Sequence, residues 1–317
     1  MCVTERWLVT GGGGFIGSHL VETLVDRGTP VVVLDDFSTG KRANLKGLGA
    51  SVEVIEASVC DFESLSRTVQ GVSVVVHLAA LPSVPRSVRD PKRSNAVNVD
   101  GTLNTLLAAK ESSVRRVICA SSSSIYGDQP DAVKIETQRP CPRSPYAVSK
   151  LAAESYCAAF HAVYGLDTLS LRFFNVFGPR QDAKSEYAAV VPKFVTSLLD
   201  GNGVTIHGDG LQTRDFTYVG NVVEAIIRAS QAEAGQGEAF NIAGGNRTSI
   251  QDLAEYAGEL TGVDLPPTYE PARPGDVRHS LADVQKATTV LGYEPRIGVR
   301  EGLRKTVEWF VEQHGSE

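Results

Sequence analysis

Short runs rich in β-branched residues alternate, through the first half of this 317-residue chain, with stretches in which apolar residues recur at helical spacing. The runs are residues 7–10, 31–34, 52–55, 72–77 and 117–120. Strands that alternate with helices predict βαβ units and therefore a parallel sheet. The runs are almost continuously apolar, as expected for strands that helices cover on both faces.

Beyond residue 178 the alternation loosens, and turns that contain glycine or proline separate shorter elements. The sequence therefore predicts an α/β fold with a doubly wound parallel sheet and a smaller α/β domain at the C-terminal end. We place the sheet domain at residues 1–178, with a returning segment near 215–245, and the smaller domain at residues 179–317.

Composition argues against several classes of protein. The net charge is −6 and the basic residues are dispersed, so nucleic acid is not an expected partner. No apolar run approaches the ~20 residues that a membrane span needs, and residues 6–9 begin a strand rather than a signal peptide, so we expect a cytosolic protein without membrane contact. The five cysteines are widely spaced and are interpreted as free thiols, and no metal site is expected.

A glycine-rich run, Thr10-Gly-Gly-Gly-Gly-Phe-Ile-Gly17, follows the first strand and precedes a helical stretch. In that setting the glycines let a helix N-terminus approach a pyrophosphate. The next strand ends in Asp35 and Asp36, about 20 residues downstream, where a carboxylate can accept both ribose hydroxyls of a dinucleotide. Such a carboxylate repels a 2′-phosphate, which favours NAD over NADP, although Lys41 and Arg42 lie close in sequence. The pattern is typical of a Rossmann-type fold that binds NAD.

Two further patterns predict a catalytic site. Tyr146 and Lys150 are four residues apart, so that on a helix the phenol and the ammonium share one face. A nearby cation lowers the pKa of a tyrosine from its usual ~10 towards neutrality, as a general base requires. Four serines, residues 121–124, end the strand before this helix. Neither pattern is specific alone, but after a dinucleotide motif both indicate active-site walls.

Together these motifs resemble the extended short-chain dehydrogenases/reductases, in particular the nucleotide-sugar 4-epimerases. The resemblance covers nearly the whole chain. Besides the motifs above it rests on His77-Leu-Ala-Ala80, Asn98-Val-Asp-Gly-Thr102, Arg172-Phe-Phe-Asn-Val-Phe-Gly-Pro-Arg180, Gly208-Asp-Gly210, Arg214-Asp-Phe216 and Arg273-Pro-Gly-Asp276. It implies an NAD-dependent UDP-sugar 4-epimerase, with UDP-sugar as partner and NAD as cofactor.

The resemblance also implies the residues of the site. Ser122, Tyr146 and Lys150 would be catalytic. The cofactor would contact Gly11, Gly14, Phe15, Ile16, Gly17, Asp35, Asp36, Ser38, Thr39, Gly40, Asp61, Leu78, Ala79, Ala80, Asn98, Tyr146 and Lys150. The nucleotide sugar would contact Ser83, Ser122, Ser123, Ser124, Tyr146, Asn175, Ala189, Val190, Arg214, Arg273, Asp276 and Ser280. The two arginines would pair with phosphates, whose geometry suits a guanidinium fork.

The implied reaction oxidises C4 of the sugar, turns the 4-keto sugar over and returns the hydride to the other face. Tyr146 would be the base, and Ser122 would orient the 4-hydroxyl. Related 4,6-dehydratases and UDP-glucuronate decarboxylases carry an acid at the position of Ser124, and one type also at Ser123. Hydroxyl groups cannot replace such acids, so the sequence favours epimerisation over a lyase reaction. An NAD-binding protein without catalysis is disfavoured because the catalytic set is intact.

The choice of sugar depends on few residues. Ser280 stands where the family has a gate beside the C2 substituent, and a small residue leaves space for an N-acetyl group. We therefore expect UDP-glucose/UDP-galactose and UDP-GlcNAc/UDP-GalNAc as substrates, although a small gate permits a large substituent without requiring it. UDP-glucuronate stays open, because Ser123 and Ser124 could bind a C6 carboxylate.

Two expectations concern the remainder of the chain. The family implies a homodimer through the helices around residues 97–111 and 146–164. His207 and His279 are interpreted as structural, because the implied mechanism needs no imidazole.

Overall fold

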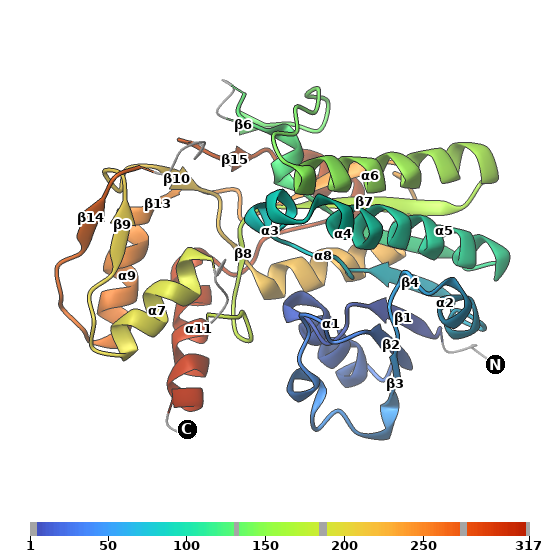
Figure 1. The fold of residues 1–317 in the computed structure, drawn as a ribbon, viewed down its shortest axis with the longest axis horizontal. Coiled ribbons are helices and arrows are strands. Elements are labelled where there is room, and N and C mark those ends of the chain that lie inside the picture. Colours follow the sequence, from blue (N-terminus) through green and yellow to red (C-terminus); the bar gives the residue numbers. More distant parts are fainter. Residues whose placement is uncertain (1–4, 130–132, 184–188, 273–277, 315–317) are drawn as a thin grey trace.

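The computed structural model describes residues 5–129, 133–183, 189–272 and 278–314 (Figure 1). Its main sheet has seven parallel strands in the order β12-β7-β5-β4-β1-β2-β3. The strands are β1 (Trp7–Thr10), β2 (Val31–Asp35), β3 (Val52–Glu56), β4 (Val74–His77), β5 (Arg116–Ser122), β7 (Asp167–Phe173) and β12 (Ala239–Ile242). This confirms the predicted Rossmann-type parallel sheet.

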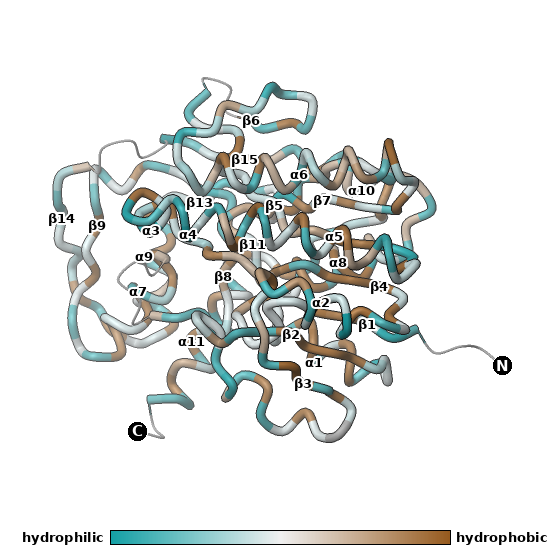
Figure 2. The backbone as a smooth tube through the Cα atoms, turned by 45° about the vertical axis from the view of Figure 1, so that its right-hand side comes forward, coloured by the Kyte–Doolittle hydropathy of each residue, from teal (hydrophilic) through white to brown (hydrophobic). Residues whose placement is uncertain are grey.

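Helices cover both faces of the sheet. Successive strand residues point to opposite faces, so each strand contributes apolar side chains to both cores. Val9 packs into one core and its neighbour Leu8 into the other, and both are fully buried. The helices on the Val9 side are α1 (Phe15–Asp26), α8 (Val219–Gln231) and α10 (Gln285–Leu291). Those on the Leu8 side are α2 (Phe62–Thr68), α5 (Gly101–Glu111) and α6 (Pro145–Tyr164). Figure 2 shows hydrophobic residues gathered in the central strands and adjoining helices.

A second body of structure lies beside the sheet, on the left in Figure 1, and has a separate apolar core. Its elements are α7 (Val190–Leu199), β9 (Thr205–His207), α9 (Ile250–Thr261), β14 (Thr268–Glu270) and α11 (Val299–His314). Short strand pairs connect it to the sheet: β6 (Val133–Lys134) with β15 (Leu281–Ala282), β8 (Val176–Phe177) with β11 (Thr217–Tyr218), and β10 (Thr213–Arg214) with β13 (Thr248–Ser249). The division into two domains at residue 178 stays a prediction.

The chain order reverses at β1, which pairs with β2 on one side and with β4 on the other. In open α/β sheets, ligands bind outside the carboxyl ends of the strands at such a switch point. The register aligns the last residue of β1, Thr10, with Leu34 of β2 and His77 of β4. The residues that follow these strands therefore meet at one edge of the sheet.

Helical segments between β4 and β5 pack along α6. They are α3 (Val84–Arg89), α4 (Pro91–Asn95), the π-helical turn η3 (Ala96–Asp100) and α5. Three short 3₁₀ turns complete the described helices: η1 (Arg42–Leu45), η2 (Gly49–Ser51) and η4 (Ser123–Tyr126). π-helical turns inside longer helices are frequent at functional sites, and η3 carries Asn98 into the interior.

A buried polar network fastens α6 to the sheet. The carboxylate of Glu154 accepts bonds from Nε and Nη2 of Arg172 on β7, at 3.0 and 2.6 Å, and from Oγ of Ser121 at 2.8 Å. Arg172 also donates to the hydroxyl of Tyr126, which in turn donates to Asn241 on β12. Removing one partner of a buried ion pair costs about 3–5 kcal/mol, so this contact strongly constrains the position of α6.

Among the described residues, no helix is long and apolar enough to cross a membrane. The cytosolic location expected from the sequence remains a prediction. The four cysteines in the described ranges are free thiols.

Candidate active site

The glycine-rich run turns sharply between β1 and α1, and two of its glycines are required by close approach. Gly11 has a φ of +72°, and a Cβ there would lie 2.7 Å from the amide nitrogen of Ala79. A Cβ on Gly17 would lie 2.2 Å from the carbonyl oxygen of Gly11. No side chain caps the first turn of α1. Its amide groups and the positive end of the helix dipole are therefore available to an anion.

Asp35 ends β2 beside this turn. Its carboxylate accepts bonds from the amides of Gly13 and Phe37, each at 2.8 Å, and only 7% of the residue is exposed. Burial raises the pKa of Asp35, while the two amides act in the opposite direction. The nearby cations are engaged elsewhere: Lys41 pairs with Asp182 at 3.3 Å, and Arg42 pairs with Glu56. The negative charge of Asp35 is therefore the main unpaired charge among the described residues at this part of the turn.

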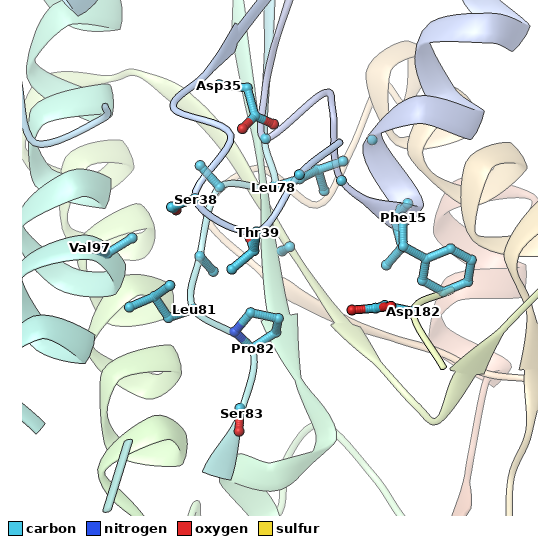
Figure 3. A pocket seen from close by; sticks show the side chains of 18 of the residues that line it. Phe15, Asp35, Ser38, Thr39, Leu78, Leu81, Pro82, Ser83, Val97 and Asp182 are labelled. Atoms are coloured by element: carbon cyan, nitrogen blue, oxygen red, sulfur yellow. The ribbon is translucent and has the colours of Figure 1, made fainter. Parts of the chain in front are cut away.

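A cavity of about 680 Å³ extends along this edge of the sheet. Figure 3 shows Asp35 above Ser38 and Thr39, with Asp182 between that loop and Phe15. Most of the residues predicted for the cofactor line this cavity. They are Gly11, Gly14, Phe15, Ile16, Gly17, Asp35, Asp36, Ser38, Thr39, Gly40, Leu78, Ala79, Ala80, Tyr146 and Lys150.

The three residues predicted to be catalytic line the same cavity. Lys150 is buried, and its Nζ donates to the carbonyl of Ala120 on β5 at 2.8 Å. Oγ of Ser122 accepts bonds from the amide and the hydroxyl of Ser124, at 3.2 and 2.9 Å. The amide of Tyr146 donates to Oγ of Ser87 at 3.0 Å, which joins the start of α6 to α3. Strand β5 thus supplies the serine, and helix α6 supplies the phenol and the ammonium.

His77 lies buried behind this site. Its ring nitrogens contact the hydroxyls of Thr10 at 2.8 Å and Thr102 at 3.1 Å. Burial, followed by the charge of Lys150, lowers the pKa of His77 to about 3. The imidazole therefore stays neutral and serves as a spacer between β1, β4 and α5.

Asn98 acts behind the cavity wall and is absent from its lining. The buried side chain accepts from the amide of Leu81 at 2.8 Å and donates to Oγ of Ser149 at 2.9 Å. These bonds tie the loop after β4 to α6. The geometry supports a positioning role for Asn98, and the direct cofactor contact that the resemblance implies stays a prediction.

Asp61 is absent from the lining of the first cavity, and the cofactor contact that the resemblance implies for it stays a prediction. It caps the N-terminus of α2, where its carboxylate accepts from the amide of Ser64 at 3.2 Å and from its hydroxyl at 2.6 Å. These bonds lower the pKa of Asp61. Ser58 and Val59, which the motif analysis missed, line the cavity instead. Their signal is their position directly after the end of β3.

A second cavity, of about 570 Å³, shares Asn175, Val176 and Ala189 with the first. Val190 and Arg214 line it as well, so four of the residues predicted for the nucleotide sugar lie here. Lys193, His207 and Phe216 also line it, although the sequence analysis assigned none of them to the substrate and interpreted His207 as structural. Lys193 follows Ala189 by one helical turn, which is a signal that could have been used.

Other predicted substrate residues divide into three groups. Ser83 lines the first cavity and caps α3, and Arg86, which was not predicted, lies beside it. Neither cavity is lined by Ser123, Ser124 or Ser280. Arg273 and Asp276 fall outside the described residues.

Comparison with known proteins agrees with this geometry. Residues 7–243 match the family model described as "NAD dependent epimerase/dehydratase family". UDP-glucose 4-epimerase of Mycolicibacterium smegmatis is 41% identical over 309 residues, which are 96% of this chain and 98% of that protein. The chain belongs to the NAD-dependent epimerase/dehydratase family.

Two solved structures share the whole fold. UDP-N-acetylglucosamine 4-epimerase from Methanobrevibacter ruminantium, in complex with UDP-N-acetylmuramic acid, is 40% identical with a TM-score of 0.94 and covers 98% of this chain and 99% of that one. UDP-glucose 4-epimerase of Thermus thermophilus in complex with NAD is 38% identical with a TM-score of 0.87, covering 96% of this chain and 99% of that chain.

The residues of this chain fit NAD. The uncapped start of α1 and the glycines that admit a close ligand suit the pyrophosphate, and Asp35 suits the adenosine ribose. The two nearby cations are paired with carboxylates, Lys41 with Asp182 and Arg42 with Glu56. The predicted preference for NAD is therefore consistent with the charges of the wall.

Asp35→Ala and Asp61→Ala should separate the two aspartates. Loss of Asp35 should raise the Kd of NAD about tenfold or more, because a charged hydrogen bond contributes about 1.5–3 kcal/mol. Loss of Asp61 should cost about 1 kcal/mol of folding stability through the helix cap and leave NAD affinity unchanged. Calorimetric NAD titration and urea unfolding measure both effects. An equal loss of NAD affinity in Asp61→Ala would contradict the geometry.

Proposed function

We propose that the protein is an NAD-dependent 4-epimerase of a UDP-sugar. The observation that carries the proposal is the meeting of Ser122, Tyr146 and Lys150 at the dinucleotide cavity, with hydroxyls at the two positions after Ser122. Ser124 is engaged with Ser122, and no carboxylate stands at either position. A lyase reaction, which removes water or carbon dioxide from the sugar, would need acid and base groups there.

The chain's own groups account for the steps at C4. Tyr146, acting as a phenolate with the ammonium of Lys150 one helical turn away, accepts the proton of the 4-hydroxyl. Ser122 orients that hydroxyl, and its own Oγ is held by the amide of Ser124. Bound NAD would supply the hydride acceptor, and later the hydride donor, for C4. After the sugar has turned over, the return of hydride to the opposite face inverts C4, and Tyr146 gives the proton back to the 4-oxygen.

The second cavity is the proposed place of the nucleotide. Asn175 and Arg214 supply polar groups for a diphosphate, and Ala189 and Val190 supply backbone near the base. Two cavities that share Asn175 and Ala189 let one ligand span both, with the uridine end in one and the hexose in the other. This arrangement supports the two-domain division proposed at residue 178, with NAD bound by the sheet domain and the nucleotide by the smaller one.

For the sugar we propose the glucose/galactose pair, extended to the N-acetylhexosamines because Ser280 is small. The relatives named for glucose and for N-acetylglucosamine substrates support this range. UDP-glucuronate is the alternative, in which Ser123 and Ser124 would bind a C6 carboxylate; these two serines, like Ser280, lie outside the lining of both cavities.

A homodimer through α5 and α6 is also proposed. These helices lie side by side, and the outer face of α6 exposes Val148, Tyr156 and Val163, the last at 70%. The three residues recur at helical spacing and form one apolar stripe. A contiguous apolar stripe on a water-facing helix is typical of an interface.

Tyr146→Phe should lower kcat by about 10²- to 10⁴-fold, because the proton acceptor is lost. Proton NMR of C4 inversion measures the rate, and NAD content should match that of the unchanged protein. Tyr164→Phe, an exposed tyrosine at the other end of α6, is the matched control and should keep full activity. Substantial activity in Tyr146→Phe would contradict the assignment of the base.

Ser280→Tyr tests the gate. The bulky side chain should reduce kcat/KM for UDP-GlcNAc by about tenfold or more and leave UDP-glucose within about twofold, because the added volume opposes only the larger substituent. Competition assays with both substrates give this ratio directly. An equal loss for both would remove Ser280 from the account of specificity.

Val163→Glu should convert the proposed dimer into a monomer, since a buried unpaired carboxylate at an interface is unfavourable. Sedimentation velocity measures the state. Val311→Glu makes the same change at an exposed valine of α11 and should leave the dimer intact. A wild-type monomer, or loss of the dimer in both variants, would contradict the proposed interface.

A further inference from the structure

Asp215 is a fully buried carboxylate that the proposed reaction does not use. It lies in the turn between β10 and β11, next to Arg214, which lines the nucleotide cavity. One oxygen, Oδ1, accepts from the amides of Gly244 and Gly245 at 2.8 and 3.1 Å. The other, Oδ2, accepts from the amide of Ala282 at 3.1 Å. One side chain thus joins the end of β12 to β15, two segments that are far apart in sequence.

The carboxylate of Asp215 accepts its hydrogen bonds from backbone amides. Successive amides such as those of Gly244 and Gly245 form an anion-binding concavity. Gly244 approaches so closely that a Cβ would lie 2.7 Å from the carbonyl of Phe216 and 3.2 Å from Oδ1 of Asp215. The segments therefore close tightly around an ionised carboxylate.

The backbone of Asp215 holds a second part of the proposed site. Its carbonyl accepts from Nδ2 of Asn175 at 3.3 Å, and the amide of Thr217 donates to the carbonyl of Asn175 at 3.2 Å. Asn175 has a φ of +30°, which is unusual for a residue with a side chain. Strained backbone persists only where its surroundings hold it, and the turn at Asp215 supplies that hold.

The third part of the proposed site is the segment from Arg278 to Ala282, which carries Ser280. The amide of Thr213 donates to the carbonyl of Arg278 at 3.0 Å, and the amide of Ser280 donates to the carbonyl of Thr213 at 3.1 Å. Nη1 of Arg214 donates to the carbonyl of Thr213 at 2.9 Å. The hydrogen bond from the amide of Ala282 to the carboxylate of Asp215 is the buried member of this set of hydrogen bonds.

We propose that Asp215 is the positioning residue of the nucleotide-sugar site. Its carboxylate fixes the segment 278–282, which carries Ser280. It also fixes the turn that carries Arg214 and supports Asn175. One buried anion thus sets the positions of Ser280, Arg214 and Asn175 around the diphosphate and the sugar. This inference rests on the proposed function, because it names how that same site is held. Asp215 touches no reacting atom and acts through its neighbours.

The pH dependence follows from burial. Desolvation, opposed by the surrounding amides, raises the pKa of Asp215 to about 6. Because this pKa is raised above its unfolded value, the group stabilises the fold most at low pH, and that contribution is lost as pH rises through about 6. Affinity for the substrate should fall as the pH is lowered, because the protonated carboxyl group has one acceptor site fewer for the three amides that it holds. Stability and substrate binding should therefore respond oppositely to acid.

Other titratable groups surround this region and must be controlled. The ring of Tyr293 is near enough for the charge of Asp215 to raise its pKa, together with burial. Arg214 and Arg278 are the flanking cations, and Arg278 pairs with the exposed Asp209 at 2.8 Å. His279 lies on the same segment, with Nδ1 3.0 Å from Oγ1 of Thr213.

The test compares Asp215→Asn with Asp209→Asn in the holoenzyme at neutral pH. Both variants remove one carboxylate that holds the segment 278–282, the first buried and the second exposed. Asp215→Asn should raise KM for UDP-glucose about tenfold and change kcat by less than about threefold, with NAD content unchanged, because the amide nitrogen cannot accept from a backbone amide. Asp209→Asn should stay within about twofold, as exposed pairs contribute little.

A second measurement does not depend on the variant folding. Calorimetric titration of the wild-type protein with UDP-glucose from about pH 5 to 8 should show affinity falling as pH drops below about 6. UDP-glucose is the probe because the terminal phosphate of UDP itself titrates near about pH 6. His279→Gln should reproduce the wild-type profile, which excludes the His279 imidazole as the source of the effect.

Each outcome decides the inference. A folded Asp215→Asn with unchanged KM overturns it, as does a wild-type affinity that is flat with pH or a profile abolished by His279→Gln. If Asp215→Asn does not fold, the wild-type and His279→Gln profiles decide alone. Failure of the wild-type protein to bind or convert any UDP-sugar at neutral pH overturns the proposed function, and this inference with it.

Discussion

The approach of Gly17 to the carbonyl of Gly11 is the contact on which the whole site depends. Only a glycine allows it, because a Cβ would stand 2.2 Å from that oxygen. The contact lets α1 (from Phe15) begin after a four-residue turn from β1, at the point where the strand order reverses. An uncapped helix start, the aspartate after β2 and the loop after β4 then surround one cavity. A parallel sheet places chemistry from distant segments along one edge, and here that edge becomes a dinucleotide site.

Two buried carboxylates hold the remainder of the site by different physical means. Glu154 pairs with Arg172 and takes a bond from Ser121, so the helix that carries Tyr146 and Lys150 is fixed against the strand that carries Ser122. Asp215 is balanced by backbone amides, with a raised pKa that records the cost of its burial. The first fixes the proposed catalytic groups, and the second is proposed to fix the nucleotide-sugar groups. Polar groups that reduce stability when buried are thus placed where geometry matters most.

Local patterns in the sequence predicted the sheet, the glycine turn and the pair on α6, because each depends on residues close together in the chain. For Asp61 the sequence was ambiguous, because an aspartate after a strand can also be a helix cap, and its bond from Ser64 is visible only in three dimensions. Ser58, Arg86 and Lys193 line the cavities without belonging to a distinctive motif. The anchoring of Ala282 by Asp215 joins positions 67 residues apart, which no periodicity could reveal.

The central claim is that C4 is inverted by removal and return of a hydride within one active site. Incubation of the holoenzyme, without added cofactor, with UDP-glucose that carries deuterium at C4 tests it most directly. The account predicts UDP-galactose in which NMR finds the deuterium still at C4, because the hydride never leaves the site. Loss of the label to solvent, or a product that lacks the C6 hydroxyl or C6 itself, would contradict the account.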